Sequence, residues 1–211
     1  TVSLLNEYFT VMVDCITEEG GMLDKFIGDA IMAIFGTPVS HDDDPDRGVR
    51  AAIKMMEELY ILNDARTKAG QIAIDHGMGL NTDTIVSGNI GSPKRMDYTV
   101  IGDGVNLAAR LESACKQYGV RIIISEYTFE ELKATYRTRE IDKVIVKGKT
   151  QPVSIFEVLD YHNKNTFPNM IEVLGNFNNG VEYYKDGRWD DAKKLFQEGL
   201  KGNPDDLCSK M

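Results

Sequence analysis

Near the beginning of the chain, two apolar stretches flank a Gly-Asp pair. Met22-Leu23 and Phe26-Ile27 precede Gly28-Asp29, and Ile31 to Phe35 follows. Because glycine permits a tight two-residue turn, this pattern predicts a β-hairpin with Gly-Asp at its tip. The exposed carboxylate of Asp29 would suit a hard cation such as Mg²⁺ or Mn²⁺, which prefers oxygen ligands. Gly-Asp turns are also common without a metal, so this stretch alone favours a plain turn.

A second polar group stands at a predicted junction between a strand and a helix. The strand ends at Gly102, and the helix begins at Asp103. Asn106 and Arg110 are four residues apart, so they share one helical face, while the apolar residues of the helix point elsewhere. Side by side near a helix start, they could hold an anion or a developing negative charge. On its own, this helix favours a surface arginine capped by an asparagine.

Together the two segments resemble one known family. Lys-Phe-Ile-Gly-Asp-Ala at residues 25–30 is followed by Asp-Tyr-Thr-Val-Ile-Gly-Asp-Gly-Val-Asn-Leu-Ala-Ala-Arg-Leu-Glu at residues 97–112. These blocks, and Val-Lys-Gly-Lys at residues 146–149, are similar to the catalytic domain of class III adenylyl and guanylyl cyclases. The resemblance runs in register from about Val2 to Tyr161.

The resemblance implies an α+β fold, a ferredoxin-like mixed sheet flanked by helices. It also implies a homodimer that binds ATP between two protomers, with two Mg²⁺ or Mn²⁺ ions in each active site. The ribose 3′-hydroxyl would attack the α-phosphate to give 3′,5′-cyclic AMP and pyrophosphate. The metals would activate the hydroxyl and neutralise the leaving group.

Residue by residue, the resemblance assigns five roles. Asp29 matches the second of two metal-binding aspartates. Lys25 matches the residue that contacts the purine, and Thr99 matches its partner at the base edge. Asn106 and Arg110 match the catalytic pair that positions the ribose and stabilises the transition state. In the family, the metal aspartate comes from one protomer and the other residues come from its partner.

The phosphate-binding cations are assigned less completely. Lys147 matches the residue that holds the terminal phosphates. For a second cation, Lys94 and Arg95 are both candidates, and Arg95 is preferred. Solvated surface charge is the simpler explanation for both Lys94 and Arg95.

The pair Lys25 and Thr99 predicts adenine as the base. In the family, Lys with Thr or Asp accompanies adenine, and Glu with a small residue accompanies guanine. A lysine donates to an acceptor such as the adenine N1, whereas guanine carries a donor there. A guanylate cyclase and a non-catalytic, nucleotide-sensing pseudo-cyclase remain the alternatives.

One block of the family is not found in the sequence. The first metal-binding aspartate of the family lies on an initial strand, in a Phe-x-Asp-Ile-x-Gly-Phe type block before the first helix. The sequence begins just after that point, and Thr1 is not an initiator methionine. We expect the chain to be a fragment whose longer polypeptide supplies this strand. Without that strand, the metal site would be incomplete and useful activity would be lost.

Helices and strands alternate around these residues. Helical periodicity predicts a first helix over Val2 to Glu19 and a second from a cap at Asp44, with Pro45 at its first position, to about Ala69. The segments after the second helix form one mixed sheet with two further helices. These segments are strands over 72–80, 84–90, 98–101, 121–125, 139–147 and 153–159, and helices over 103–117 and from a cap at Ser125 to 136.

The pattern changes after residue 161, so we divide the chain into a catalytic domain over 1–161 and a C-terminal segment over 162–211. The segment matches a tetratricopeptide-like helical hairpin, with small residues where two helices would cross and Asn203-Pro204 ending the second. One reading is a hairpin packed on the domain. The other is the first unit of a repeat array that binds a protein partner. The positions that carry the match are Phe177, Gly180, Tyr184, Gly187, Trp189, Ala192, Phe196, Leu200 and Pro204.

Composition limits the class of protein, its partners and its location in the cell. Hydrophobic residues make up 42% of the chain and charged residues 27%, as in ordinary globular proteins. The net charge of -9 argues against a nucleic-acid partner. No apolar run is long enough to cross a membrane. The 3 cysteines have no zinc or redox spacing, which favours reduced thiols and a cytoplasmic location.

Overall fold

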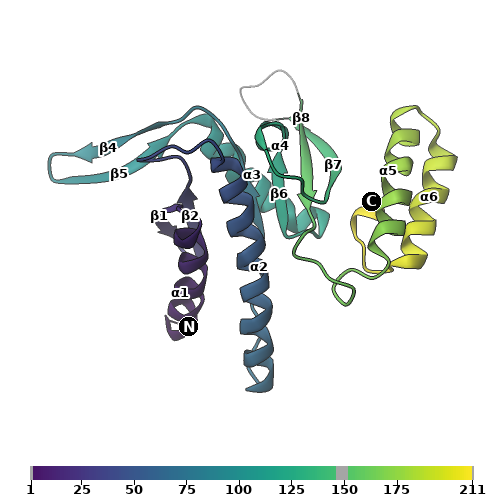
Figure 1. Ribbon diagram of the computed structural model, residues 1–211, viewed down its shortest axis with the longest axis horizontal. Helices are drawn as coiled ribbons and strands as arrows, with labels where there is room; N and C mark the ends of the chain where they lie inside the picture. Colours follow the sequence, from purple (N-terminus) through teal and green to yellow (C-terminus); the bar gives the residue numbers. More distant parts are fainter. Residues whose placement is uncertain (1, 146–151, 211) are drawn as a thin grey trace.

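The computed structural model describes residues 2–145 and 152–210. Helices and strands alternate along the chain up to a pair of C-terminal helices (Figure 1). Their bounds are α1 Val2–Glu18, β1 Met22–Ile27, β2 Ala30–Ile34, α2 Asp44–Lys68, β3 Met78–Leu80, β4 Val86–Ser92, β5 Arg95–Ile101, α3 Asp103–Tyr118, β6 Ile122–Ser125, α4 Glu126–Glu131, β7 Thr138–Ile145, β8 Pro152–Val158, α5 Met170–Lys185, α6 Trp189–Gly202 and the 3₁₀ turn η1 Cys208–Lys210.

The described strands form three sheets. The central one has four strands in the order β3-β6-β8-β7. It is mixed, because β3 runs parallel to β6 and the other neighbours are antiparallel. The pairs β1-β2 and β4-β5 form separate antiparallel hairpins, and the second extends away from the body as a long arm (Figure 1). The α+β class and the mixed sheet flanked by helices are confirmed, but the strands do not join into one sheet.

Three predicted boundaries differ from the structure, and in two of them side chains satisfy the local backbone. The strand predicted over 72–80 is reduced to β3. Before it, Asn63 bonds both the N–H and the carbonyl of Ile74, and Arg66 donates to the carbonyl of Ile72. These bonds from α2 replace strand pairing.

The helix after Ser125 and the start of α2 also differ. Ser125 caps α4 as predicted, accepting from the N–H of Thr128, but α4 ends at Glu131 rather than at 136. The buried carboxylate of Asp46 accepts from the N–H groups of Lys133 and Ala134 and holds the following loop. At α2, the cap position is Asp43 rather than Asp44.

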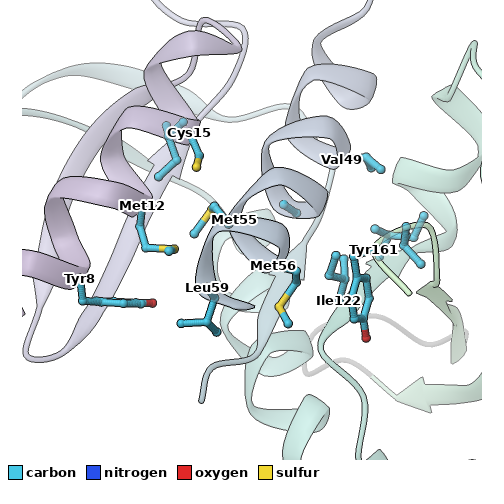
Figure 2. Packing of buried hydrophobic residues seen from close by; sticks show 13 residues of the cluster. Tyr8, Met12, Cys15, Val49, Met55, Met56, Leu59, Ile122 and Tyr161 are labelled. Carbon is cyan, nitrogen blue, oxygen red and sulfur yellow. The ribbon is translucent and has the colours of Figure 1, made fainter. Parts of the chain in front are cut away.

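The main core lies on both faces of β6. Ile122 and Ile124 face a cluster formed with α1 and α2, which includes Met12, Met56 and Leu59 (Figure 2). Ile123 points to the other face, into a cluster formed mainly with α3. Since successive strand residues alternate between faces, a strand of four buried residues can hold helices on both sides of the sheet. None of the helices that the structure describes is long and apolar enough to cross a bilayer.

Helix α3 packs directly on the backbone of β3. A Cβ atom added at Gly79 would lie 2.2 Å from the carbonyl oxygen of Ala108 and 2.3 Å from the nitrogen of Glu112. Because backbone atoms cannot move aside as a flexible side chain can, only glycine allows this separation of helix and strand. The contact fixes the position of α3 and of its outward-facing residues.

The C-terminal hairpin is packed on the domain, as one of the two readings expected. Phe177 of α5 belongs to the same core cluster as Leu107 and Leu111 of α3. The buried Arg139 donates to Glu157 at 2.6 Å and to both carboxylate oxygens of Asp206 at 2.7 and 2.9 Å. Its guanidinium also lies over the Phe177 ring, 4.7 Å from the centroid. Arg139 therefore joins the sheet, α5 and the chain after α6.

A first prediction concerns the contact between α3 and β3. We expect Gly79→Ala to lower the free energy of unfolding by about 1–3 kcal/mol, because helix and strand must separate. Gly88→Ala is the matched control, since a Cβ at this strand glycine would meet nothing within 4 Å. Urea unfolding of the two variants and the wild type measures the difference. Equal stability of the two variants would show that α3 can move away from β3 at little cost in free energy.

A second prediction concerns the buried charges around Arg139. Arg139 faces two buried carboxylates, so the cluster carries a net negative charge if both are ionised. Burial raises the pKa of Glu157 from its ordinary value of 4.5 to about 7, although Arg139 opposes this shift. Burial also opposes ionisation of Asp206, but hydrogen bonds from Arg139 and Ser209 outweigh it and lower the pKa of Asp206. Glu157 is therefore the group that takes a proton.

Because the folded chain binds this proton more tightly than the unfolded chain, the stabilisation due to Glu157 is largest below pH 4.5 and is lost as pH rises through about 7. Glu157→Gln removes the titration. We expect the unfolding free energy of the wild type, minus that of the variant, to fall by up to about 3 kcal/mol between about pH 5 and about pH 8. Denaturant unfolding across this range measures it, with the exposed Glu182→Gln as control. A pH-independent difference would contradict the prediction.

Candidate active site

Asp29 occupies the tip of the β1-β2 hairpin, as predicted. Ile27 pairs with Ala30, so Gly28 and Asp29 form the two-residue turn. Gly28 adopts a positive φ of 66°, which is the conformation that this turn requires at its first central position. The Asp29 side chain is exposed. Burial, followed by the negative charge of Asp29, raises the pKa of Tyr8 on α1 to about 12.

An aromatic contact fixes the hairpin against α1. The rings of Phe9 and Phe26 stack with centroids 4.2 Å apart. Phe26 follows Lys25 on β1, so the stack anchors the strand that carries Lys25. A two-stranded hairpin is marginally stable alone, and this support gives Lys25 and Asp29 a defined position.

Lys25 and Thr99 meet although they lie on separate sheets. Both contact the carboxylate of Asp24. The Thr99 hydroxyl donates to Asp24 Oδ2 at 2.9 Å, and the Lys25 ammonium lies 3.4 Å from the same oxygen. The Lys25 side chain is 45% exposed and the Asp24 side chain is fully buried. The two residues expected to read the base are therefore adjacent, and Lys25 remains open to a ligand.

Asp24 has no role in the sequence-based assignment. The signal that could have identified it is a carboxylate within the apolar run Met22 to Ile27, at a position that the hairpin buries. Its other oxygen, Oδ1, is buried and has no hydrogen-bond partner among the residues that the structure describes. Buried carboxylate oxygens without partners are rare and require an explanation.

Asn106 and Arg110 lie on the outward face of α3. Both are exposed, whereas Leu107 and Leu111 are buried on the opposite side. Neither polar side chain has a hydrogen bond or ion pair with any described residue, so the guanidinium is free to meet an anion. The start of α3 is held by Asn81, which donates to the carbonyl of Gly104 at 3.2 Å and accepts from Ser125.

Of the two remaining phosphate-binding candidates, the structure describes only Arg95, and it does not bring Arg95 to this group. Arg95 lies near the tip of the arm, opposite Ser92. Its side chain is 83% exposed and pairs with Asp97 at 3.3 Å. Lys147 lies outside the described residues. Their roles stay predictions.

The described residues do not form a complete two-metal centre. No group of three or more histidine, cysteine, aspartate or glutamate side chains is arranged to hold a metal ion in residues 2–145 and 152–210. Asp43 and Asp44, from the acidic run after β2, are engaged locally. Asp43 pairs with Arg47 and Arg50, and Asp44 accepts from the N–H of His41. Asp29 by itself supplies too few ligands for two ions.

A cavity of about 400 Å³ separates the hairpin from the central sheet. Residues of β2, α2, β3 and α3 line it, and most of them are apolar. Its charged lining residues are Asp44, Asp83 and Glu112, with no lysine or arginine from the described chain. Such a lining offers no positively charged side chain to a triphosphate. The cavity does lie between the edges of β2 and β3, which pair with no further strand among the described residues.

Comparisons with known proteins identify the family of this chain. Residues 1–160 match the protein family described as the adenylate and guanylate cyclase catalytic domain. An adenylate cyclase of Anabaena cylindrica is 43% identical over 161 residues, which are 73% of this chain and 31% of that protein. The terminal-differentiation-specific adenylate cyclase of Dictyostelium discoideum is 36% identical over 209 residues, which are 97% of this chain and 10% of that protein.

A solved structure shares the fold. The crystal structure of the guanylyl cyclase Cya2 has a TM-score of 0.66 at 40% identity and covers 74% of this chain and 79% of that one. This chain spans 31% or less of the length of the two sequence relatives above. The match over residues 1–160 nevertheless covers more than half of the chain. This chain therefore belongs to the family of adenylate and guanylate cyclase catalytic domains.

Proposed function

We propose that this domain converts ATP to 3′,5′-cyclic AMP and pyrophosphate at the interface of a homodimer. The observation that carries the proposal is the meeting of Lys25 and Thr99 around Asp24. The Lys25 ammonium can donate to the adenine N1, and the Thr99 oxygen can accept from the adenine 6-amino group. The names of the Anabaena and Dictyostelium relatives support the same activity.

Asn106 and Arg110 act on the reacting part of the nucleotide. Asn106 can hydrogen-bond the ribose and hold its 3′-hydroxyl toward the α-phosphate. Arg110 has no competing carboxylate among the described residues, and it meets the negative charge that grows on the α-phosphate oxygens as pyrophosphate leaves. Such an interaction is stronger in the transition state than in the bound substrate, so it accelerates turnover.

A second protomer supplies the other half of each site. Asp29 and the outward face of α3 belong to different elements, and the family arrangement takes them from different chains. The β4-β5 arm supports association, because Val86, Met96 and Ile101 on it are more than half exposed. Exposed apolar side chains gathered on one projecting element are typical of an interface.

Divalent metal would neutralise phosphate charge when bound, and further carboxylates must complete its site. We place one of them on a further extended segment of the family's catalytic domain, which would fill the cavity between β2 and β3. Both strand edges that border the cavity carry free backbone hydrogen-bonding groups, and the lining is apolar, as a buried strand requires. A protein partner for the C-terminal hairpin and a cytoplasmic location stay predictions.

The role of Arg110 predicts a separation of turnover from binding. We expect Arg110→Ala to lower kcat by about 100-fold to 1000-fold while the affinity for ATP changes little. Arg188→Ala, which removes an exposed arginine of the C-terminal hairpin, is the matched control. Pyrophosphate release is measured on the full-length protein. An unchanged rate in Arg110→Ala would remove Arg110 from the mechanism.

The role of Lys25 predicts a change of base preference. A carboxylate in its place can accept from the donors on the edge of guanine but not donate to the adenine N1. We therefore expect Lys25→Glu to lower the ratio of kcat/KM for ATP over GTP by at least about tenfold. Lys143→Glu, on the exposed side of β7, makes the same charge change elsewhere. If both variants keep the wild-type ratio, Lys25 does not contact the base.

A further inference from the structure

The Asp24 carboxylate lies beneath the two residues that the proposed function uses to read the base. One of its oxygens accepts from the Thr99 hydroxyl at 2.9 Å and lies 3.4 Å from the Lys25 ammonium. The Asp24 side chain is fully buried while that of Lys25 is 45% exposed. Asp24 is therefore placed to act on a bound base through its neighbours, without touching the base.

A β-bulge creates this arrangement. Leu23 pairs with Ala33 and Lys25 pairs with Met32, so Asp24 is an extra residue opposite the β2 strand. In a regular strand, Asp24 and Lys25 would point to opposite faces of the hairpin. A bulge changes the direction of a side chain, and bulges are frequent beside active sites. Here it allows the Asp24 carboxylate to reach both Lys25 and Thr99 of β5.

The hydrogen bond between Thr99 and Asp24 has a fixed direction. A carboxylate only accepts hydrogen bonds, and a threonine hydroxyl has one proton to give. Once that proton is directed to Asp24, the Thr99 oxygen can only accept from a ligand. Adenine offers a 6-amino donor at that edge, whereas guanine offers a 6-oxo acceptor. Guanine would place two acceptors against each other, with no proton between them.

We propose that Asp24 is a specificity-determining residue, which selects adenine by holding the Thr99 hydroxyl as an acceptor and the Lys25 ammonium as a donor. This inference rests on the proposed function, since it assumes that Lys25 and Thr99 face the base. It also explains the buried Oδ1 without a partner. A carboxylate retained there at a cost in stability is expected where function requires it.

The test compares two substitutions at Asp24. Asp24→Leu removes the acceptor and frees the Thr99 proton to donate to guanine. Asp24→Asn keeps an amide oxygen that can still accept from Thr99, so it preserves the direction of the bond. A purely structural role would be disturbed by both. Asp64→Leu, which replaces an exposed carboxylate of α2, is the matched control.

The measurement is displacement of a fluorescent N-methylanthraniloyl nucleotide by ATP and by GTP, together with turnover of both, in the full-length protein. We expect Asp24→Leu to lower the ATP-over-GTP preference about tenfold, and Asp24→Asn to keep it within about twofold. Thr99→Val removes the hydroxyl and should reach the level of Asp24→Leu. If Asp24→Leu does not fold, Thr99→Val still tests the proposal, because it leaves Asp24 in place.

The outcomes separate this inference from the proposed function. Unchanged preference in both Asp24→Leu and Thr99→Val, or a wild-type preference for GTP, would overturn the role of Asp24. Binding that prefers ATP and depends on Asp24, but without release of pyrophosphate, would uphold that role and reject the proposed reaction.

Discussion

The site depends on support for two hairpins that lie outside the central sheet. A two-stranded hairpin alone is marginally stable in water, because it buries too little apolar surface. Lys25 and Asp29 stand on one such hairpin and Thr99 on the other. The contact between Thr99 and Asp24 joins the two hairpins. The hydroxyl of Tyr98 also bonds that of Thr37, in the loop just after β2, at 3.2 Å, and the Phe9–Phe26 stack holds the first hairpin to α1. Site geometry and hairpin stability therefore rely on the same few contacts.

Local signals in the sequence were sufficient for the elements but not for their assembly. The Gly-Asp turn, the buried run of β6 and the α3 face with Asn106 and Arg110 follow from periodicity and turn chemistry, which act over a few residues. The separation into three sheets depends on which strand edges meet, and nothing local encodes that. The shortened β3 is a separate case, because Asn63 and Arg66, near the end of α2, bond the backbone that periodicity had assigned to a strand.

Asp24 shows a different limit of sequence interpretation. Alternation along β1 places it on the face opposite Lys25, and only the bulge brings the two together. A bulge has no reliable signature in a single sequence. The family resemblance assigned roles to Lys25 and Thr99 at matching positions but said nothing of the group between them. The structure identifies that group as the carboxylate of Asp24, whose burial is otherwise unfavourable.

The C-terminal hairpin shows that a repeat-like sequence can serve as part of a domain. Arg139 connects it to the sheet through Glu157 and Asp206, and these three side chains are at most 2% exposed. Breaking a buried pair by removing one partner is strongly destabilising, because an unpaired charge remains. The similarity to the Dictyostelium protein extends over 97% of this chain, so it includes the hairpin as well as the cyclase domain. Domain and hairpin therefore form one packed unit in this protein.

Overall similarity and base preference are separate questions for this fold. The chain is 43% identical to a relative named as an adenylate cyclase and 40% identical to a structure named as a guanylyl cyclase. Identity of this order reports the shared scaffold, whereas the choice between adenine and guanine depends on the direction of two or three hydrogen bonds. In this chain one of those directions is set by the Asp24 carboxylate, which cannot donate. A residue that does not contact the nucleotide can thus control which base the site accepts. It does so by accepting the only hydroxyl proton of a neighbouring residue that does contact the nucleotide.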